Sequence, residues 1–212
     1  DWDFGAWTLR SVRTGKYLTE DKNFFDETPQ DENAVTIDPG MNCTADVVFG
    51  WFVKELLYAK EEDGVLYLDT WQHRAVAVND ENKLVAKAGS GDCPCKQFTL
   101  EVVSSGAERV AELAQRADHV IVCAGNQPLI NAREEYDRPD IRLPKAQTAL
   151  LNAAAAANES TLLYLVTGYP FAINKEKDTA KAVLCSTHLG PCLGHVAAAT
   201  VFGENNPAGR TP

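Results

Sequence analysis

Apolar and polar residues alternate along the first half of the chain, with the two-residue period of half-buried β-strands. Within residues 7–19 the alternation continues on both sides of Thr14-Gly15, which predicts a β-hairpin. A similar alternation returns within residues 66–78. Two further strands are predicted at residues 82–86 and 97–103, so this half of the chain is expected to be mainly β-structure.

The two hairpin-like patterns align with each other when Leu9 is set against Leu68. This repeat resembles the one in fascin-like β-trefoils, where a complete domain contains three such units; two are clear here. Residues 20–46 are polar and rich in Pro, Asn and Asp, which predicts an irregular segment. We therefore assign residues 1–105 to a β-rich, trefoil-like domain.

The second half of the chain, residues 106–212, alternates between helical and extended patterns. Ser105-Gly-Ala-Glu108 has the sequence of a capping box and leads into apolar residues at a 3.6-residue period. Because strands that alternate with helices form a mostly parallel sheet between helices, we expect a three-layer α/β domain, which makes the whole chain an α+β protein in two parts. The later elements are predicted as strands at 119–123, 161–166 and 182–186, and as helices at about 145–157, 173–180 and 192–201.

The net charge of −10 lies almost entirely in the first half of the chain. Residues 1–105 contain 19 Asp and Glu against 10 Lys and Arg, whereas residues 106–212 contain 11 against 10. An acidic surface repels phosphate backbones, so nucleic acid is not an expected partner. No apolar stretch approaches the length that spans a bilayer, so no membrane partner is expected either.

The six cysteines show no metal-binding spacing. Cys93-Pro-Cys95 lacks the two-residue spacer of a zinc knuckle, so neither a metal nor another cofactor is predicted. Cys123 and Cys185 fall inside apolar strands, where a free thiol behaves as a small hydrophobic group. We expect reduced thiols and a bacterial cytoplasmic protein, with secretion left open.

A long charged loop after the strand at 119–123 is the main candidate for a functional site. Residues 126–143 carry four acidic and three basic side chains before the next helix begins. In an open α/β sheet, ligands bind at the carboxyl ends of the strands. A loop of this length is more often functional than a plain connection.

The order Glu134-x-x-Asp137-Arg138-x-x-Ile-x-Leu-Pro144 in this loop resembles the acid/base loop of family 3 glycoside hydrolases. The resemblance covers about residues 107–212 and implies that this part forms the family's α/β domain, with the β-rich residues as an insertion. Four more segments follow in the family's order: Pro144-Lys-Ala-Gln147, Leu162 to Pro170, Ser186 to Gly190, and Val201 to Arg210.

The resemblance also implies roles for individual residues. Glycoside hydrolysis in its common form uses two carboxyl groups, of which one is a general acid/base and the other, in retaining enzymes, a nucleophile. By its position in the motif Glu134 is the acid/base. The candidates for substrate binding are Arg133, Asp137, Arg138 and His188; for Asp137 and Arg138, a mutual ion pair or an anchoring role in the loop is the alternative.

The family's nucleophile is an aspartate of a barrel domain, in a Ser/Thr-Asp-Trp/Tyr setting. No such triplet occurs in this sequence, which begins at Asp1. We therefore expect a fragment whose main partner is the missing barrel and which is inactive alone. For the intact enzyme the resemblance implies retaining exo-hydrolysis of a β-linked glucoside or xyloside.

The residues themselves suggest two other functions. A non-catalytic module is one alternative: the tryptophans of the β-rich half would stack on sugars, or this half would only support the missing barrel. A dinucleotide-binding domain is the second, but the segment around Gly125 has a single glycine where Gly-x-Gly-x-x-Gly is required. The four tryptophans are Trp2, Trp7, Trp51 and Trp71.

Overall fold

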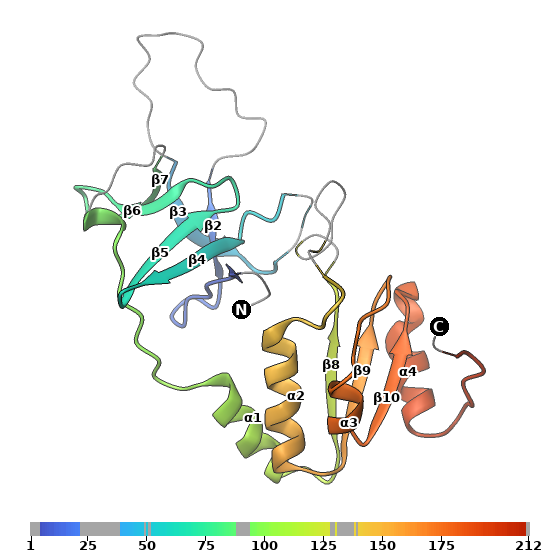
Figure 1. The fold of residues 1–212 in the computed structure, drawn as a ribbon. Helices are drawn as coiled ribbons and strands as arrows, with labels where there is room; N and C mark the ends of the chain where they lie inside the picture. The colour runs from blue at the N-terminus through green and yellow to red at the C-terminus, as the bar shows by residue number, and fades with distance from the viewer. Residues whose placement is uncertain are drawn as a thin grey trace. The chain divides into compact units, whose positions relative to one another are not determined.

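The computed structural model describes residues 5–21, 39–48, 50, 52–87, 94–127, 130, 138 and 140–210 (Figure 1). The chain divides into two compact units. The first, called the β-rich unit, comprises Asp1–Val103 and Gln127–Asp137. The second, called the α/β unit, comprises Ser104–Asn126 and Arg138–Pro212.

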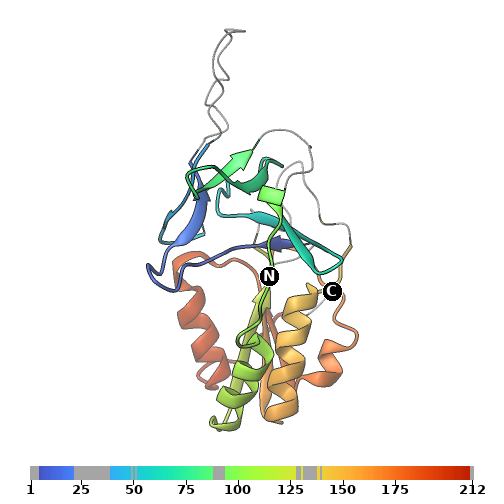
Figure 2. The same ribbon diagram turned by 90° about the vertical axis from the view of Figure 1, so that its left-hand side faces the viewer.

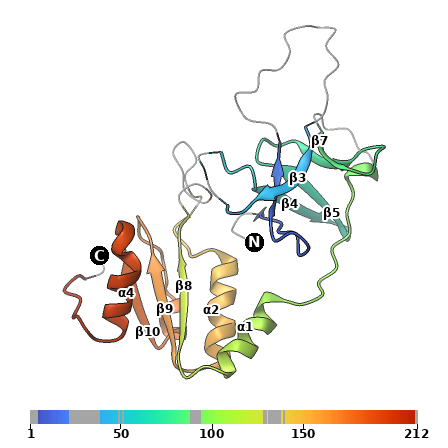
Figure 3. The same cartoon turned by 180° about the vertical axis from the view of Figure 1, so that it is seen from behind.

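In its described residues, the β-rich unit has two antiparallel sheets and one short 3-10 helix, η1 (Pro94–Lys96). The larger sheet has the strand order β1-β4-β5-β6-β7 and the smaller one pairs β2 with β3. Gly40 bridges to Val85, which links the small sheet to β7, as seen from behind in Figure 3. The strands are β1 (Ala6–Trp7), β2 (Tyr17–Glu20), β3 (Met41–Ala45), β4 (Leu57–Glu62), β5 (Val65–Thr70), β6 (Ala75–Val78) and β7 (Leu84–Lys87).

The hairpin predicted around Thr14-Gly15 forms, because Ser11 donates its amide to the Lys16 carbonyl at 2.9 Å and Gly15 adopts a φ of +70°. The pattern at residues 66–78 becomes β5 and β6, which pair through Asp69 and Ala75. The core of the unit gathers residues from both patterns. It is formed by Leu18, Met41, Leu57, Leu66, Leu68, Val76 and Ala86, with Leu9 packed against it.

Three predictions for this half of the chain were wrong or incomplete. The strand expected at 97–103 is absent: only Phe98 pairs, with Leu66, because the following apolar side chains are exposed instead of packed. Met41–Ala45 forms β3, although residues 20–46 were expected to be irregular; residues 22–38 lie outside the described part of the chain. The strand β4 was not predicted at all.

The α/β unit has a parallel three-stranded sheet in the order β10-β9-β8. The helices α2 and α4 lie on opposite sides of these strands (Figure 2), and α1 packs against α2. The strands are β8 (Val120–Gly125), β9 (Thr161–Val166) and β10 (Ala182–Ser186). The helices are α1 (Gly106–Gln115), α2 (Lys145–Ala157), α3 (Glu176–Thr179), η2 (Gly190–Cys192) and α4 (Leu193–Val201). The predicted parallel sheet with alternating helices is therefore confirmed.

The first helix begins at the predicted capping box. Ser105 is its N-cap: the Ser105 hydroxyl accepts from the Glu108 amide, and the Glu108 carboxylate accepts from the Ser105 amide, both at 3.1 Å. The helix packs against α2, and Asn158 after α2 donates to the carbonyls of Ala114 and Ala117 at 3.0 and 2.7 Å. These contacts join the two helices at their ends.

The core of this unit lies between the sheet and α2. The central strand β9 is largely buried, as expected for a strand covered on both faces, but the flanking strands are less so. Cys123 and Cys185 are exposed and do not fill the core, which corrects the expectation for these thiols. The core residues are Val122, Ala124, Leu143, Leu151, Ala154, Leu163, Leu165 and Ala180.

The expectation of reduced thiols holds for only part of the chain. Cys95 is disulfide-bonded. The sequence analysis compared the spacing of this cysteine only with that of a zinc site and did not predict a disulfide bond. The free thiols in the described residues are Cys43, Cys123, Cys185 and Cys192. Partial burial raises the pKa of the Cys185 thiol.

Within the described ranges, none of the helices has the length and apolar character needed to cross a bilayer.

Candidate active site

The candidate site is at the carboxyl edge of the parallel sheet, where the loops after β8, β9 and β10 begin. The arrowheads of the three strands mark this edge in Figure 1. Because the strands are parallel and paired in register, Gly125, Val166 and Ser186 end them at neighbouring positions. This edge is where α/β proteins of this kind bind their ligands.

The chain can leave β8 as it does only because residue 125 is glycine. Gly125 has a φ of +146°, and a Cβ at this position would lie 1.9 Å from the Val166 carbonyl oxygen. The Gly125 amide donates to Gln147 Oε1, and Gln147 Nε2 donates to the Gly125 carbonyl, both at 2.9 Å. Gln147 lies in the first turn of α2, so the helix fixes the start of the loop by two hydrogen bonds.

The first residue of the loop, Asn126, is held by the loops after the other two strands. Its side-chain oxygen accepts from the Gly168 amide at 3.0 Å and lies 3.3 Å from His188 Nε2. The structure therefore places the predicted site residue His188 beside the beginning of the charged loop. His188 is exposed, so its ring remains accessible to solvent in this chain.

At the other end of the loop, Arg138 stacks on aromatic rings. Its guanidinium carbon lies 4.0 Å from the ring centroid of Tyr169 and 5.0 Å from that of Phe171. A guanidinium over an aromatic face within about 6 Å is a stabilising cation–π contact. Arg138 is thus positioned by its aromatic neighbours; its contact with substrate stays a prediction.

The loop after β9 holds both ends of the charged loop. Gly168 donates a hydrogen bond to Asn126. Tyr169 and Phe171, within the next three residues, stack against the Arg138 guanidinium. We refer to residues 167–173 as the clamp segment. Sequence reasoning noticed this segment only as a family resemblance and did not assign it, or Asn126, any part in the site.

Residues 140–143, which follow Arg138, are held by hydrogen bonds and by core packing. Arg142 donates from its backbone amide and its guanidinium to the Asp140 carboxylate, and these hydrogen bonds lower the pKa of Asp140 below its usual value. The Ala172 amide donates to the Ile141 carbonyl at 2.7 Å, and Leu143 is buried in the core. The clamp segment therefore contacts the chain at a third point.

The remaining predicted site residues cannot be located from these contacts. Arg133, Glu134 and Asp137 lie outside the described residues. Of the predicted residues that are described, Arg138 stacks on Tyr169 and Phe171 of the clamp segment, and His188 lies beside Asn126, which the same segment binds. In the described part of the chain no group of three or more His, Cys, Asp or Glu side chains is arranged to hold a metal ion.

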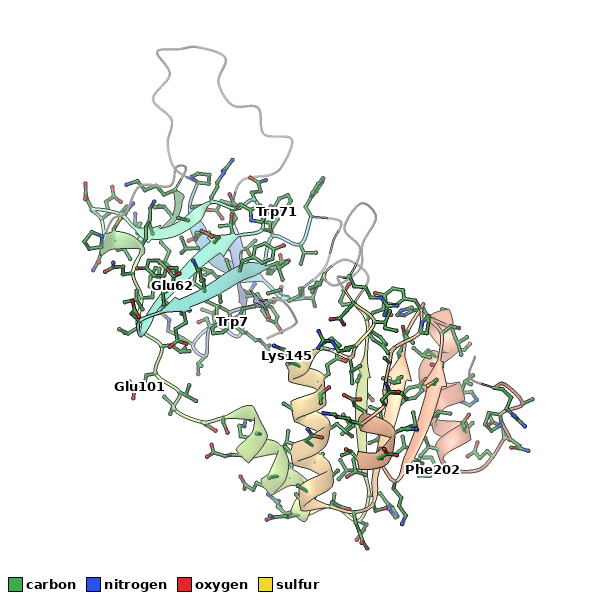
Figure 4. All side chains as sticks on the ribbon, in the orientation of Figure 1. Trp7, Glu62, Trp71, Glu101, Lys145 and Phe202 are labelled. Carbon is green, nitrogen blue, oxygen red and sulfur yellow. The ribbon has the colours of Figure 1, made fainter. Side chains whose placement is uncertain are left out.

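Two of the four tryptophans can be assigned to cores of the β-rich unit. Trp7 packs against the cluster around Leu57, and Trp71 packs against a second cluster formed by Ala6, Val53 and Leu56. Both are labelled in Figure 4 and belong to the β-rich unit. This packing favours a structural role for Trp7 and Trp71 over a sugar-stacking one. Trp2 and Trp51 lie outside the described residues.

Comparison with known proteins places the chain in a family. The model of the glycosyl hydrolase family 3 C-terminal domain matches residues 16–212. The match covers most of the chain, including much of the β-rich half. The chain therefore belongs to glycosyl hydrolase family 3.

Several relatives have names that describe glycosidases. A periplasmic beta-glucosidase of Salmonella typhimurium is 31% identical over 50% of this chain and 14% of its own length. An exo-alpha-(1->6)-L-arabinopyranosidase of Bifidobacterium longum is 32% identical over 53% of this chain and 15% of its own length. Beta-D-xylosidase 3 of Arabidopsis thaliana is 27% identical over 89% of this chain and 28% of its own length.

Solved structures of the same family are also similar. The beta-glucosidase of Kluyveromyces marxianus in complex with glucose gives a TM-score of 0.47 at 25% identity, over 55% of this chain and 14% of that chain. The family 3 beta-glucosidase of Bifidobacterium adolescentis gives 0.44 at 30% identity, over 50% and 16%. This chain thus spans only a small part of the length of the proteins that it matches.

Proposed function

We propose that this chain supplies the general acid/base of a retaining, exo-acting β-glycosidase, and that Glu134 is this residue. The observation that carries the proposal is that residues near both ends of the charged loop are held in place. Asn126 and Arg138 are both fixed at the carboxyl edge of the sheet by the clamp segment. Family membership and the position of Glu134 in the acid/base motif support the same conclusion.

The proposed chemistry needs a second carboxylate. Glu134 would protonate the glycosidic oxygen as it leaves and then, as a base, activate the water that releases the sugar. The nucleophile, which lies about 5 Å from the acid/base in retaining enzymes, would come from a barrel domain outside this chain. The chain alone would then not hydrolyse glycosides.

The substrate is proposed to be a β-linked glucoside or xyloside, in line with the names of the bacterial and plant relatives. Arg133, Asp137, Arg138 and His188 are proposed to contact its hydroxyl groups or to shape the pocket. For His188 the support is its exposed ring beside Asn126. For Arg138 it is the fixed position of the guanidinium over the rings of Tyr169 and Phe171, at the carboxyl edge of the sheet.

Two further features belong to the proposal. The β-rich half is proposed to be trefoil-like, since Leu9 and Leu68, equivalent in the two sequence repeats, pack at the same core. For the cellular location, the cytoplasm was expected with secretion left open. The disulfide bond of Cys95 and the periplasmic name of one relative both favour export.

The test is the substitution Glu134→Gln in the longer protein that contains this chain. For phenyl β-glucoside, whose leaving group needs protonation, kcat/KM should fall by at least about 100-fold. For 2,4-dinitrophenyl β-glucoside, whose leaving group departs unprotonated, kcat/KM should change much less.

Glu135→Gln is the matched control, because it removes the neighbouring carboxylate of the same loop. It should leave the ratio of the two kcat/KM values close to that of the parent. Equal losses on both substrates in Glu134→Gln, or a greater split in Glu135→Gln, would contradict the assignment of Glu134.

A further inference from the structure

The β-rich unit contains a hydrophobic contact that involves the charged loop itself. Ile130 packs against a cluster of three buried side chains, Ala6, Val53 and Leu56, which are 5%, 2% and 5% exposed. We call this cluster the Ile130 site. Its rim is completed by the partly buried side chains of Val48, Tyr58 and Trp71.

A backbone hydrogen bond also holds Ile130. The Ile130 amide donates to the Gln127 carbonyl at 2.9 Å, which closes the chain immediately after it has left the α/β unit. Ile130 is apolar within a loop whose following residues are strongly charged. Burial of this aliphatic side chain against an apolar cluster removes its surface from water and so attaches the chain at this point.

The Ile130 site is built on paired strands and on a local turn. Ala6 pairs with Tyr58 between β1 and β4, and the Leu56 amide donates to the Val53 carbonyl at 3.0 Å. On the rim, the ring of Trp71 lies 5.4 Å from that of Phe52. These contacts are made by residues of the β-rich unit other than the loop, so the Ile130 site is built on the strands and turn of that unit.

The charged loop passes from the α/β unit to the β-rich unit and back, and Ile130 lies on the part assigned to the β-rich unit. The chain leaves the α/β unit after Asn126, joins the β-rich unit for Gln127–Asp137, and returns at Arg138. Asn126 and Arg138 are held by the clamp segment, whereas Ile130, four residues before Glu134, is held by the β-rich unit. The loop therefore has an anchor between its two ends.

We propose that the β-rich unit is a positioning element for catalysis, and that Ile130 and the Ile130 site fix the loop that carries Glu134. This inference rests on the proposed acid/base role of Glu134. It gives the β-rich unit a role in the reaction of the same protein, instead of a separate role in binding sugars.

The first test is kinetic and uses the longer protein with Ile130→Ala. Loss of the anchor should misplace the acid, so kcat/KM for phenyl β-glucoside should fall by about tenfold or more. For 2,4-dinitrophenyl β-glucoside the fall should be less than about threefold, since this substrate needs no acid. Ile130→Val, which removes one methylene group, should give a smaller difference between the falls in kcat/KM for the two substrates, in the same direction. We call this difference the leaving-group split.

The control is Leu150→Ala, which truncates a partly buried aliphatic side chain on α2 that packs against the other core. A variant that only weakens the fold lowers the amount of active enzyme and affects both substrates equally. A split in Ile130→Ala that is absent from Leu150→Ala supports the proposal. Equal effects on the two substrates in Ile130→Ala overturn it.

The second test measures the anchor without activity. Val53→Ala opens space beneath Ile130, so hydrogen exchange of the Ile130 amide should become at least about tenfold faster, while the amides of β9 keep their parent rates. An unchanged Ile130 rate overturns the inference. If Glu134→Gln shows no leaving-group split, the proposed function fails, and the exchange result still decides whether the Ile130 site anchors the loop.

Discussion

At the scale of single residues, Gly125 determines how the chain enters the candidate site. Its φ of +146° and its contact with the Val166 carbonyl leave no room for a side chain. Both of its backbone polar groups are bonded to Gln147, so the residue cannot move without losing two hydrogen bonds. The strand therefore ends at a fixed point, from which Asn126 reaches Gly168 and His188.

The substitution Gly125→Ala should destabilise the chain by about 3 kcal/mol or more, because it combines backbone strain with overlap against a backbone oxygen. The measurement is urea unfolding followed by far-UV circular dichroism. Gly106→Ala is the control, since a Cβ at the first position of α1 meets nothing within 4 Å. Equal unfolding midpoints for the two variants would refute the steric argument.

The residues of the candidate site differ in how far the sequence could predict them. Glu134, Arg138 and His188 were predicted because they occupy positions in a family motif or follow a strand, and for Glu134 the role stays a prediction. Asn126 was missed because its partner Gly168 is 42 residues away, a contact that only the parallel pairing of β8 and β9 creates. For Gln147 a signal existed, since it ends the Pro144-Lys-Ala-Gln motif, but its bonds to Gly125 required the structure.

At the scale of elements, the α/β unit followed its hydrophobic pattern closely. The predicted elements at 145–157, 161–166 and 182–186 are those observed, because apolar strands and an alanine-rich helix give strong periodic signals. The helix expected at 173–180 is shorter and comprises Glu176–Thr179. Its start at Lys175 and Glu176 is polar, so no periodic pattern of apolar residues marks where this helix begins.

The β-rich unit was predicted less well. The strand β4 runs into Lys60-Glu-Glu62, and its exposed, charged end conceals the alternation on which strand prediction depends. The signal that could have revealed it is Asp63-Gly64, a hairpin turn in which both residues have positive φ. At residues 97–103 the alternation was present, but only Phe98 has a strand partner, so the pattern alone was misleading.

The capping box of α1 makes the stability of the chain depend on pH. The hydroxyl and amide of Ser105 donate to the Glu108 carboxylate and lower the pKa of Glu108 below its ordinary value of 4.5. A lowered pKa in the folded state means that this contribution is present above pH 4.5 and is lost as the pH falls through the folded pKa.

Glu108→Gln should therefore be less stable than the parent at pH 7, and the difference should shrink at pH 3. Urea unfolding at both pH values measures it. Glu112→Gln, which removes the charge of an exposed acidic residue further along the same helix, is the control for the loss of a negative charge from α1. A difference between Glu108→Gln and the parent that is the same at pH 7 and pH 3 would be evidence against the box.

At the scale of the whole molecule, the charged loop belongs to two units in turn. Its ends lie in the α/β unit and its Ile130 in the β-rich unit. In the proposed mechanism, a carboxylate of this loop must face a second carboxylate outside the chain. The proposed activity would then require the barrel as well as both units.

The chain alone should accordingly show no hydrolysis of aryl β-glucosides, while the longer protein that contains it hydrolyses them. The comparison uses equal molar amounts and 2,4-dinitrophenyl β-glucoside, the substrate least dependent on an acid. Circular dichroism of the chain alone serves as the control for folding. Turnover by the chain itself would mean that the nucleophile lies within these 212 residues.

The most direct measurement is the product formed by Glu134→Ala of the longer protein, which leaves space for a small anion, from 2,4-dinitrophenyl β-glucoside in the presence of azide. An anionic nucleophile needs no general base, so azide should restore turnover and release a glucosyl azide of retained β-configuration. This result is predicted if Glu134 is the acid/base of a retaining enzyme. No rescue, or an azide of inverted configuration, would contradict the account.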